Sequence, residues 1–181
     1  KVSQVLIDDI KKHGGEPVMS KTGHSFIESK MKEIDAPLAG EVSGHLFFAE
    51  NYYGFDDAFL GAAKILEIAS KSDKSFSHLF DDVPATFTTP EYKAHCPDDR
   101  KFPIIEELTG YFTSNYDCIT IDGVRVNFPG MAWGAVRASN TSPNLTLRFE
   151  APEKEQLREI ETIFYEQIKK FPEVDTGWYK Q

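Results

Sequence analysis

The sequence changes its pattern near residue 84, and this change constrains the fold more than any other feature. Before it, helical patterns alternate with short apolar runs, which indicates an α/β unit. After it come four short apolar runs in succession: CITI (118–121), VRVNF (124–128), WGAVR (133–137) and LTLRFE (145–150). The intervening stretch carries Pro84, Pro90 and Pro97 and is typical of a linker. We therefore expect two domains, residues 1–84 and residues 85–181, the second beginning with this linker.

The first region is expected to form a parallel strand-helix-strand unit. A helix should stop at Gly14-Gly15, followed by PVM (17–19) as a short buried strand. KTGH (21–24) precedes a helix with Ile27, Met31 and Ile34 on one face, and PLAG then runs into GEVSGH (40–45) as a second strand. Such a crossover places both polar segments at the ligand-binding edge of a sheet. Residues 55–70 predict a helix capped by Asp56 and packed deep against that sheet.

The second region is expected to form an α+β domain. Residues 102–112 predict a helix, and Asp122-Gly123 is a strong hairpin signal between the first two strands. A final helix follows Pro152, with an apolar stripe formed by Leu157, Ile160, Ile163, Phe164 and Ile168. Helices combined with consecutive antiparallel strands define this class.

Charge and composition narrow the function. The formal net charge is -9, which repels nucleic acid and anionic lipid, so neither is an expected partner. The sequence has no run of 18 apolar residues and no signal-peptide core at its start, and we expect a cytoplasmic protein without a membrane segment. Cys96 and Cys118 are 22 positions apart without CxxC spacing, which predicts free thiols.

RASNTSP (137–143) is the candidate anion-binding loop. Arg137 can donate two parallel N–H bonds to phosphate oxygens, while Ser139, Asn140 and Thr141 add neutral donors. The alternative is an ordinary polar hairpin whose side chains cap their own turn. Spacing alone does not decide between the two.

GEVSGH and KTGH are the candidate sugar-binding segments. Glu41 can accept hydrogen bonds from neighbouring ligand hydroxyls, Ser43 adds a polar contact, and the flanking glycines let the backbone approach a ligand. His45 is a candidate proton shuttle or a structural residue, and His24 a candidate contact or the neighbour of a helix cap. Adjacent acid pairs such as Asp56-Asp57 diverge on either a helix or a strand, so no metal site is expected.

Three motifs in this order, KTGH, GEVSGHLFF...YGFDDAFLGAAKILEI and DGVRV...WGAVRASNTSP, resemble the bacterial phosphomannomutase/phosphoglucomutase branch of the α-D-phosphohexomutases. The resemblance implies a four-domain isomerase and makes residues 1–84 a third domain lacking its start, an α/β domain with a truncated mixed sheet. Residues 85–181 resemble the fourth domain, an antiparallel, TATA-binding-protein-like sheet with helices. Val42 departs from the Met or Gln usual at its position.

The resemblance also implies roles for individual residues. GEVSGH is similar to the loop that holds the sugar O3 and O4, so Glu41 and Ser43 are expected sugar contacts, with Lys1 as a further one. RASNTSP is similar to the loop that holds the phosphate not being transferred, which implicates Arg137, Ser139, Asn140 and Thr141. His45 resembles a general acid/base, and His24 a second catalytic residue.

The implied reaction interconverts mannose or glucose 6-phosphate and 1-phosphate through a phosphoserine enzyme and a hexose 1,6-bisphosphate. The phosphoserine loop and the Mg²⁺-binding loop belong to the N-terminal domains, which are the expected partners, and neither motif occurs in these residues. We therefore expect the chain alone to be inactive, with Mg²⁺ and the bisphosphate as cofactors of the longer enzyme. The alternatives are a non-catalytic sugar-phosphate-binding module and a phosphoglucosamine mutase.

Overall fold

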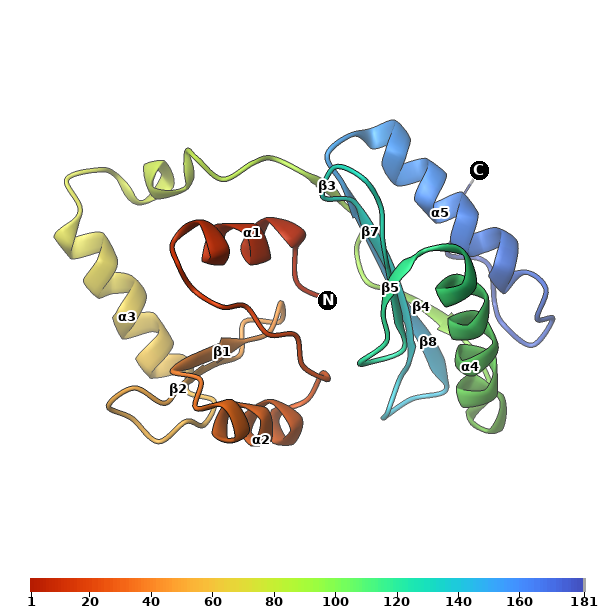
Figure 1. Ribbon diagram of the computed structural model, residues 1–181, viewed down its shortest axis with the longest axis horizontal. Helices are drawn as coiled ribbons and strands as arrows, with labels where there is room; N and C mark the ends of the chain where they lie inside the picture. Colours follow the sequence, from red (N-terminus) through yellow and green to blue (C-terminus); the bar gives the residue numbers. More distant parts are fainter. Residues whose placement is uncertain (181) are drawn as a thin grey trace. The chain divides into compact units, whose positions relative to one another are not determined.

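The structure is a computed structural model that describes residues 1–180 (Figure 1). It consists of two compact units, Lys1–Pro84 and the residues from Ala85 onward. Each unit is described below by itself. No helix in the described part of the chain is long and apolar enough to cross a membrane.

The first unit builds a small sheet against one helix. Its β1 (Leu38–Gly40) and β2 (Leu46–Phe48) pair antiparallel, with Leu38 opposite Phe48. The unit's helices are α1 (Gln4–Lys12), α2 (His24–Ile34), α3 (Ala58–Lys71) and the 3₁₀ helix Phe76–Phe80. The core of this unit is the cluster of Ile27, Met31 and Phe47, which joins α2 to β2.

The predicted parallel crossover is wrong. Residues 17–19 form no strand, and Val18 is 48% exposed. GEVSGH reverses the chain instead, because the Glu41 N–H donates to the His45 carbonyl and Gly44 adopts a φ of 92°. This turn returns β2 beside β1, so the sheet pairing in the described residues of this unit is antiparallel.

Helix α3 differs from its prediction in both its cap and its burial. Asp57, one residue later than expected, is the N-cap. Gly61 is the buried residue of the helix, while Phe59 is 91% exposed. At Gly61 a Cβ would lie 3.0 Å from Leu46 Cδ1, so the helix contacts β2 through its smallest residue. Two strands of three residues each cannot cover the remaining faces of a 14-residue helix.

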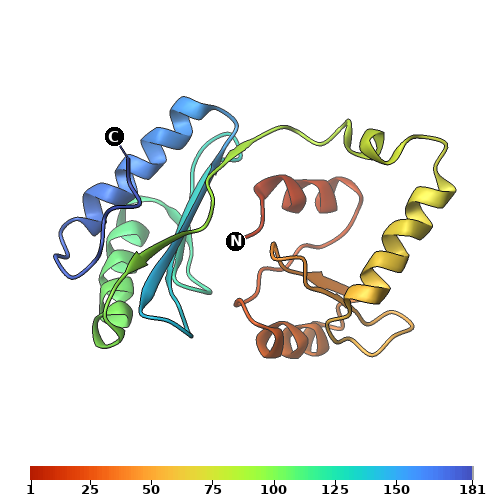
Figure 2. The same ribbon diagram turned by 180° about the vertical axis from the view of Figure 1, so that it is seen from behind.

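The second unit is an antiparallel sheet covered by helices on one face (Figures 1 and 2). The strand order is β3-β8-β7-β6-β5, and β4 also pairs with β8. Both predicted helices and all four predicted strands are present, and the class of an α/β domain followed by an α+β domain is confirmed. The elements are β3 (Phe87–Thr88), β4 (Tyr92–His95), α4 (Asp98–Asn115), β5 (Asp117–Ile119), β6 (Val124–Asn127), β7 (Trp133–Ala138), β8 (Asn144–Ala151) and α5 (Lys154–Ile168).

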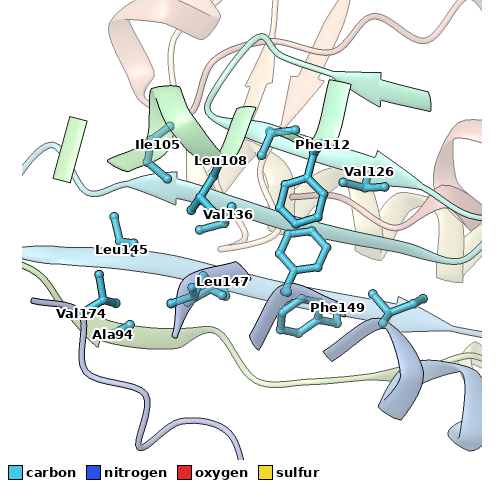
Figure 3. Packing of buried hydrophobic residues seen from close by; sticks show 14 of the residues in the cluster. Ala94, Ile105, Leu108, Phe112, Val126, Val136, Leu145, Leu147, Phe149 and Val174 are labelled. Atoms are coloured by element: carbon cyan, nitrogen blue, oxygen red, sulfur yellow. The ribbon is translucent and has the colours of Figure 1, made fainter. Parts of the chain in front are cut away.

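Strand periodicity explains the core of this unit. Alternate residues of β6, β7 and β8, among them Val126, Val136 and Leu147, point toward the helices (Figure 3). The rings of Phe112 from α4 and Phe164 from α5 stack with centroids 4.5 Å apart. Cys96 and Cys118 are free thiols, as predicted, and Cys96 is buried in this core. The intervening residues of the strands, including Arg125 and Arg137, lie on the opposite face.

Candidate active site

The Glu41 carboxylate joins the two polar segments of the first unit. Its Oε1 accepts the Gly23 backbone N–H at 2.9 Å, and its Oε2 accepts the Ser43 hydroxyl at 3.1 Å. KTGH and GEVSGH therefore lie together, as predicted, although no strand precedes KTGH. Each carboxylate oxygen has a second lone pair for an incoming hydroxyl, so Glu41 is oriented by its neighbours and still able to accept.

The imidazoles of His24 and His45 lie against each other and share one carboxylate. Their ring centroids are 4.4 Å apart. His45 Nδ1 lies 2.7 Å from Asp56 Oδ2, and His24 Nε2 lies 3.7 Å from the same oxygen. The other oxygen, Oδ1, accepts the Leu46 backbone N–H at 3.2 Å, which fixes the carboxylate plane. A carboxylate on Nδ1 leaves Nε2 of His45 as the nitrogen that can exchange a proton with a ligand.

Asp56 is a site residue that sequence reasoning missed, because it was assigned to the cap of α3. The cap is Asp57, whose Oδ1 accepts the Leu60 N–H at 2.9 Å. The Tyr52 hydroxyl donates to Asp57 Oδ2 at 2.6 Å, and this bond lowers the pKa of the Asp57 carboxyl and raises that of Tyr52. The adjacent acids diverge, as expected from their spacing, and the signal for Asp56 was the position of FDD directly before the helix.

Arg137 is the last but one residue of β7 and the first residue of RASNTSP, and its side chain has polar neighbours on two sides. Its Nη1 donates to the Ala138 carbonyl at 3.2 Å, and its Nε lies 3.6 Å from Asp122 Oδ2. The hairpin tip packs on its backbone, because a Cβ at Gly123 would lie 2.7 Å from Arg137 Cα. The guanidinium side chain is 14% exposed, so it is held in place and has limited contact with solvent.

Some polar side chains of RASNTSP are buried in the loop, and others are exposed. Ser139 is buried, its Oγ lies 2.8 Å from Ser142 Oγ, and it accepts the Thr141 N–H at 3.4 Å. Asn140 and Thr141 are exposed. Ser139 thus shapes the turn, as in the polar-hairpin alternative, while the two exposed residues are free to face a ligand.

Lys101 is a second cation beside this loop that the sequence analysis did not single out. It is 4% exposed, and its Nζ donates to the Ser142 carbonyl at 3.1 Å and to Asp98 Oδ1 at 2.7 Å. The lysine ties the first turn of α4 to the loop. Its signal in the sequence was a lysine following the Asp98-Asp99 pair, a spacing that suits an ion pair across one helical turn.

The sheet face that carries Arg137 holds a further buried cation. Arg125 lies over the Trp133 ring at 4.2 Å, and the Trp133 indole N–H donates to Glu150 at 3.2 Å. Burial lowers the pKa of Arg125 to about 10, while Glu150 opposes the shift. The guanidinium therefore stays charged at neutral pH, and this face has positive charge although the chain is acidic.

Two further expectations concern Lys1 and metal binding. Lys1 is partly buried and precedes α1, and its role as a sugar contact stays a prediction. Within the described residues, the metal-capable grouping is His24, His45 and Asp56, with two nitrogens and one oxygen. Mg²⁺ takes oxygen ligands in an octahedron, so this grouping does not fit it.

Comparisons with known proteins agree with the two-unit architecture. The family model described as "Phosphoglucomutase/phosphomannomutase, alpha/beta/alpha domain III" matches residues 1–87, and the model of the C-terminal domain of the same family matches residues 91–167. The chain belongs to the phosphoglucomutase/phosphomannomutase family, and it matches the third and fourth domains. The family resemblance stated from the sequence is confirmed.

Individual relatives place the chain more narrowly. It is 48% identical over 170 residues to a phosphomannomutase/phosphoglucomutase of Pseudomonas aeruginosa, covering 93% of this chain and 36% of the relative. It is 45% identical over 175 residues to a phosphoglucomutase of Neisseria gonorrhoeae, covering 95% of this chain and 38% of the relative. A solved structure of a Burkholderia thailandensis family member superposes with a TM-score of 0.81 at 38% identity, over 91% of this chain and 35% of that one. The chain thus spans little more than a third of the length of its relatives.

Proposed function

We propose that this chain is the sugar- and phosphate-binding part of a phosphohexomutase that interconverts the 6- and 1-phosphates of mannose and glucose. The observation that carries the proposal is the Glu41 carboxylate, held by Gly23 and Ser43, four residues before an imidazole that is itself held by a carboxylate. The hydrogen-bond acceptor Glu41 and the proton-transfer group His45 therefore belong to the same turn. The relatives named above are phosphomannomutases and phosphoglucomutases, which supports the same reaction.

Glu41 and Ser43 are the proposed contacts of the sugar O3 and O4. A bisphosphorylated sugar that binds in two opposite orientations presents O3 and O4 at positions that nearly exchange on turning. Two carboxylate oxygens with free lone pairs suit two neighbouring hydroxyls in either orientation. The C2 hydroxyl, at which mannose and glucose differ, then needs no dedicated partner. Lys1 remains a proposed further contact of the sugar.

His45 is the proposed general acid/base, with His24 as the second catalytic residue. Asp56 orients the His45 ring, so that Nε2 can give a proton to a sugar oxygen or take one from it. In the reaction, phosphoryl transfer to a hexose hydroxyl requires that hydroxyl to lose its proton. An oriented imidazole can accept this proton near neutral pH.

Arg137, Asn140 and Thr141 are the proposed contacts of the phosphate that is not being transferred, and Ser139 shapes their loop. Arg137 can pair with two phosphate oxygens, and Lys101 and Arg125 add positive charge to the same unit. The Mg²⁺ ion and the phosphoserine belong to domains outside this chain, which are its proposed partners together with hexose phosphate. We propose a cytoplasmic enzyme with hexose 1,6-bisphosphate as the intermediate.

The sugar role is tested by Glu41→Gln in the product of the complete gene. Loss of one acceptor and of the charge should lower kcat/KM by about 1 to 3 kcal/mol of transition-state binding, equally for mannose and glucose phosphates. Glu50→Gln, an exposed carboxylate of the same unit, is the matched control and should change nothing. A near-normal kcat/KM in Glu41→Gln, or a loss confined to one sugar, would contradict the assignment.

The phosphate role is tested by Arg137→Ala in the same protein. The charge-assisted contact should be worth about 1.5 to 3 kcal/mol of hexose phosphate binding. Arg158→Ala, which removes an exposed arginine of α5, serves as the control. Unchanged KM and kcat in Arg137→Ala would remove the loop from the site.

The same assays separate the alternatives. A binding module would bind hexose phosphates without turning them over, even as the complete gene product. A phosphoglucosamine mutase would turn over glucosamine phosphate in preference to the mannose and glucose phosphates.

A further inference from the structure

The histidine pair and Asp56 have an additional chemical capacity that the proposed proton transfer does not use. His24, His45 and Asp56 each offer one ligand atom, and these atoms all lie within 4.8 Å of one another. Two imidazole nitrogens and one carboxylate oxygen form the donor set of many catalytic zinc sites. We propose that these three side chains bind a divalent transition-metal ion such as Zn²⁺. Their two nitrogen donors do not suit Mg²⁺, which prefers oxygen ligands.

The distances are close to those that coordination needs. Zinc bonds of about 2.0 to 2.2 Å place tetrahedral ligand atoms about 3.4 Å apart. His24 Nε2 and Asp56 Oδ2 are 3.7 Å apart, which is near this value. His45 Nδ1 and Asp56 Oδ2 are 2.7 Å apart, because a proton lies between them. A metal ion in place of this proton requires the two atoms to separate by less than 1 Å. The third pair, formed by one nitrogen of each imidazole, lies within 4.8 Å and must close for both rings to share one ion.

The surroundings support a pre-positioned yet open site. Asp56 Oδ1 is held by the Leu46 N–H, the kind of outer contact that orients a ligating carboxylate. His24 packs edge-on against the fully buried Phe47 with centroids 5.4 Å apart. The His24 and His45 side chains are 47% and 42% exposed, so solvent can reach the three donors and supply a fourth ligand. The two imidazole nitrogens favour zinc, nickel and copper over magnesium, which prefers oxygen ligands.

The consequence for the enzyme rests on the proposed function. A metal ion on His45 Nδ1 and His24 Nε2 would occupy lone pairs and displace the His45–Asp56 hydrogen bond. It would thereby remove the oriented acid/base from the reaction. Zinc-class ions should therefore inhibit the mutase by a route independent of its Mg²⁺ site, and a chelator should restore activity.

The binding experiment uses the 181-residue chain and does not depend on activity. Zn²⁺ is titrated against a chromophoric chelator, and Co²⁺ provides a coordination spectrum in the visible range. We expect one saturable site, with ring ¹⁵N resonances of His24 and His45 shifting together. His24→Ala, His45→Ala and Asp56→Asn should each weaken it by more than about tenfold, since even outer contacts of metal ligands carry that much affinity.

The chain offers a matched control in another histidine–aspartate pair. His78 of the 3₁₀ helix has its Nδ1 3.1 Å from Oδ2 of Asp81, the residue that follows the helix. Among residues 1–180, this pair belongs to no grouping of three metal-binding side chains. His78→Ala should leave Zn²⁺ affinity unchanged. Circular dichroism of each variant shows whether it folds. The proposal is overturned by the absence of saturable binding, or by folded His45→Ala and Asp56→Asn proteins that bind Zn²⁺ as tightly as the parent. Zinc binding without inhibition of the complete enzyme would instead contradict the acid/base role of His45 and leave the metal site standing.

Discussion

The two units hold their polar loops by different means. RASNTSP connects two long strands in the middle of a sheet, over a core of 20 buried residues. GEVSGH connects two three-residue strands over a buried cluster of three. In the second unit, backbone pairing and packing position Arg137. In the first unit, separate side-chain hydrogen bonds of Glu41, Asp56 and Asp57 position the polar groups. The comparison indicates that an oriented site needs either a large core or a dense set of local polar contacts.

The largest expected effect tests the core of the second unit. Phe164 is fully buried between Phe112 and Phe149, with ring centroids 4.5 and 5.1 Å away. Phe164→Ala should lower the opening free energy of this unit by about 3 to 5 kcal/mol through lost contacts and a cavity. Native-state hydrogen exchange of the β7 and β8 amides measures it, and the β1 and β2 amides should be unaffected.

Phe59 in α3 provides the control for this prediction. It is 91% exposed, and Phe59→Ala should change the opening free energy by less than about 0.5 kcal/mol. Equal losses in the two variants would show that buried area does not distinguish the units. A Phe164→Ala effect that spreads into β1 and β2 would show that they do not open separately.

Much of the second unit could be predicted from the sequence, because its signals are local and periodic. The stripe from Leu157 to Ile168 and the alternation in VRVNF each specify one buried face. The first unit was harder. PVM is too short for its apolar pattern to decide whether a partner strand exists, and the apolar positions of α3 carry no information on what covers them. The second unit was therefore easier to predict because its strands and helices are long enough to show a clear apolar period.

The candidate sites show the same limit. The spacing within GEVSGH and RASNTSP was enough to nominate Glu41, His45 and Arg137. It could not reveal that Asp56 and Lys101 complete the two clusters, since they are 11 and 41 positions from His45 and Ser142. It also could not reveal that Ser139 turns inward, because burial depends on the strands that flank it.

A smaller effect tests the backbone support of Arg137. Gly123 has a φ of 72°, and a Cβ there would lie 2.3 Å from the Val136 carbonyl oxygen. Gly123→Ala should therefore destabilise the second unit by about 1 to 3 kcal/mol and shift the Arg137 resonances. Gly110, inside α4 with nothing within 4 Å of its Cβ position, is the opposite case. Gly110→Ala should stabilise the unit by about 0.5 to 1 kcal/mol. If Gly123→Ala leaves the thermal unfolding of the unit and the Arg137 resonances unchanged, the hairpin tip does not brace Arg137.

The smallest effect concerns one hydrogen bond of the first unit, and it appears as a shift in titration. The pKa of Asp57 lies below its usual value of 3.8, first because of the Tyr52 hydroxyl and then because of the Leu60 N–H. A lowered pKa in the folded state means that the ionised cap contributes stability above the usual value and loses it as pH falls through the folded pKa. Tyr52→Phe removes the larger cause, so the Asp57 pKa should rise toward 3.8 and α3 should fray at a higher pH.

Carboxyl ¹³C shifts report this titration. Asp82, whose pKa Lys12 lowers, is the internal reference and should titrate alike in both proteins. An unchanged Asp57 titration in Tyr52→Phe would mean that the helix dipole and the Leu60 N–H hold this cap, and that the first unit depends less on side-chain hydrogen bonds than the comparison requires.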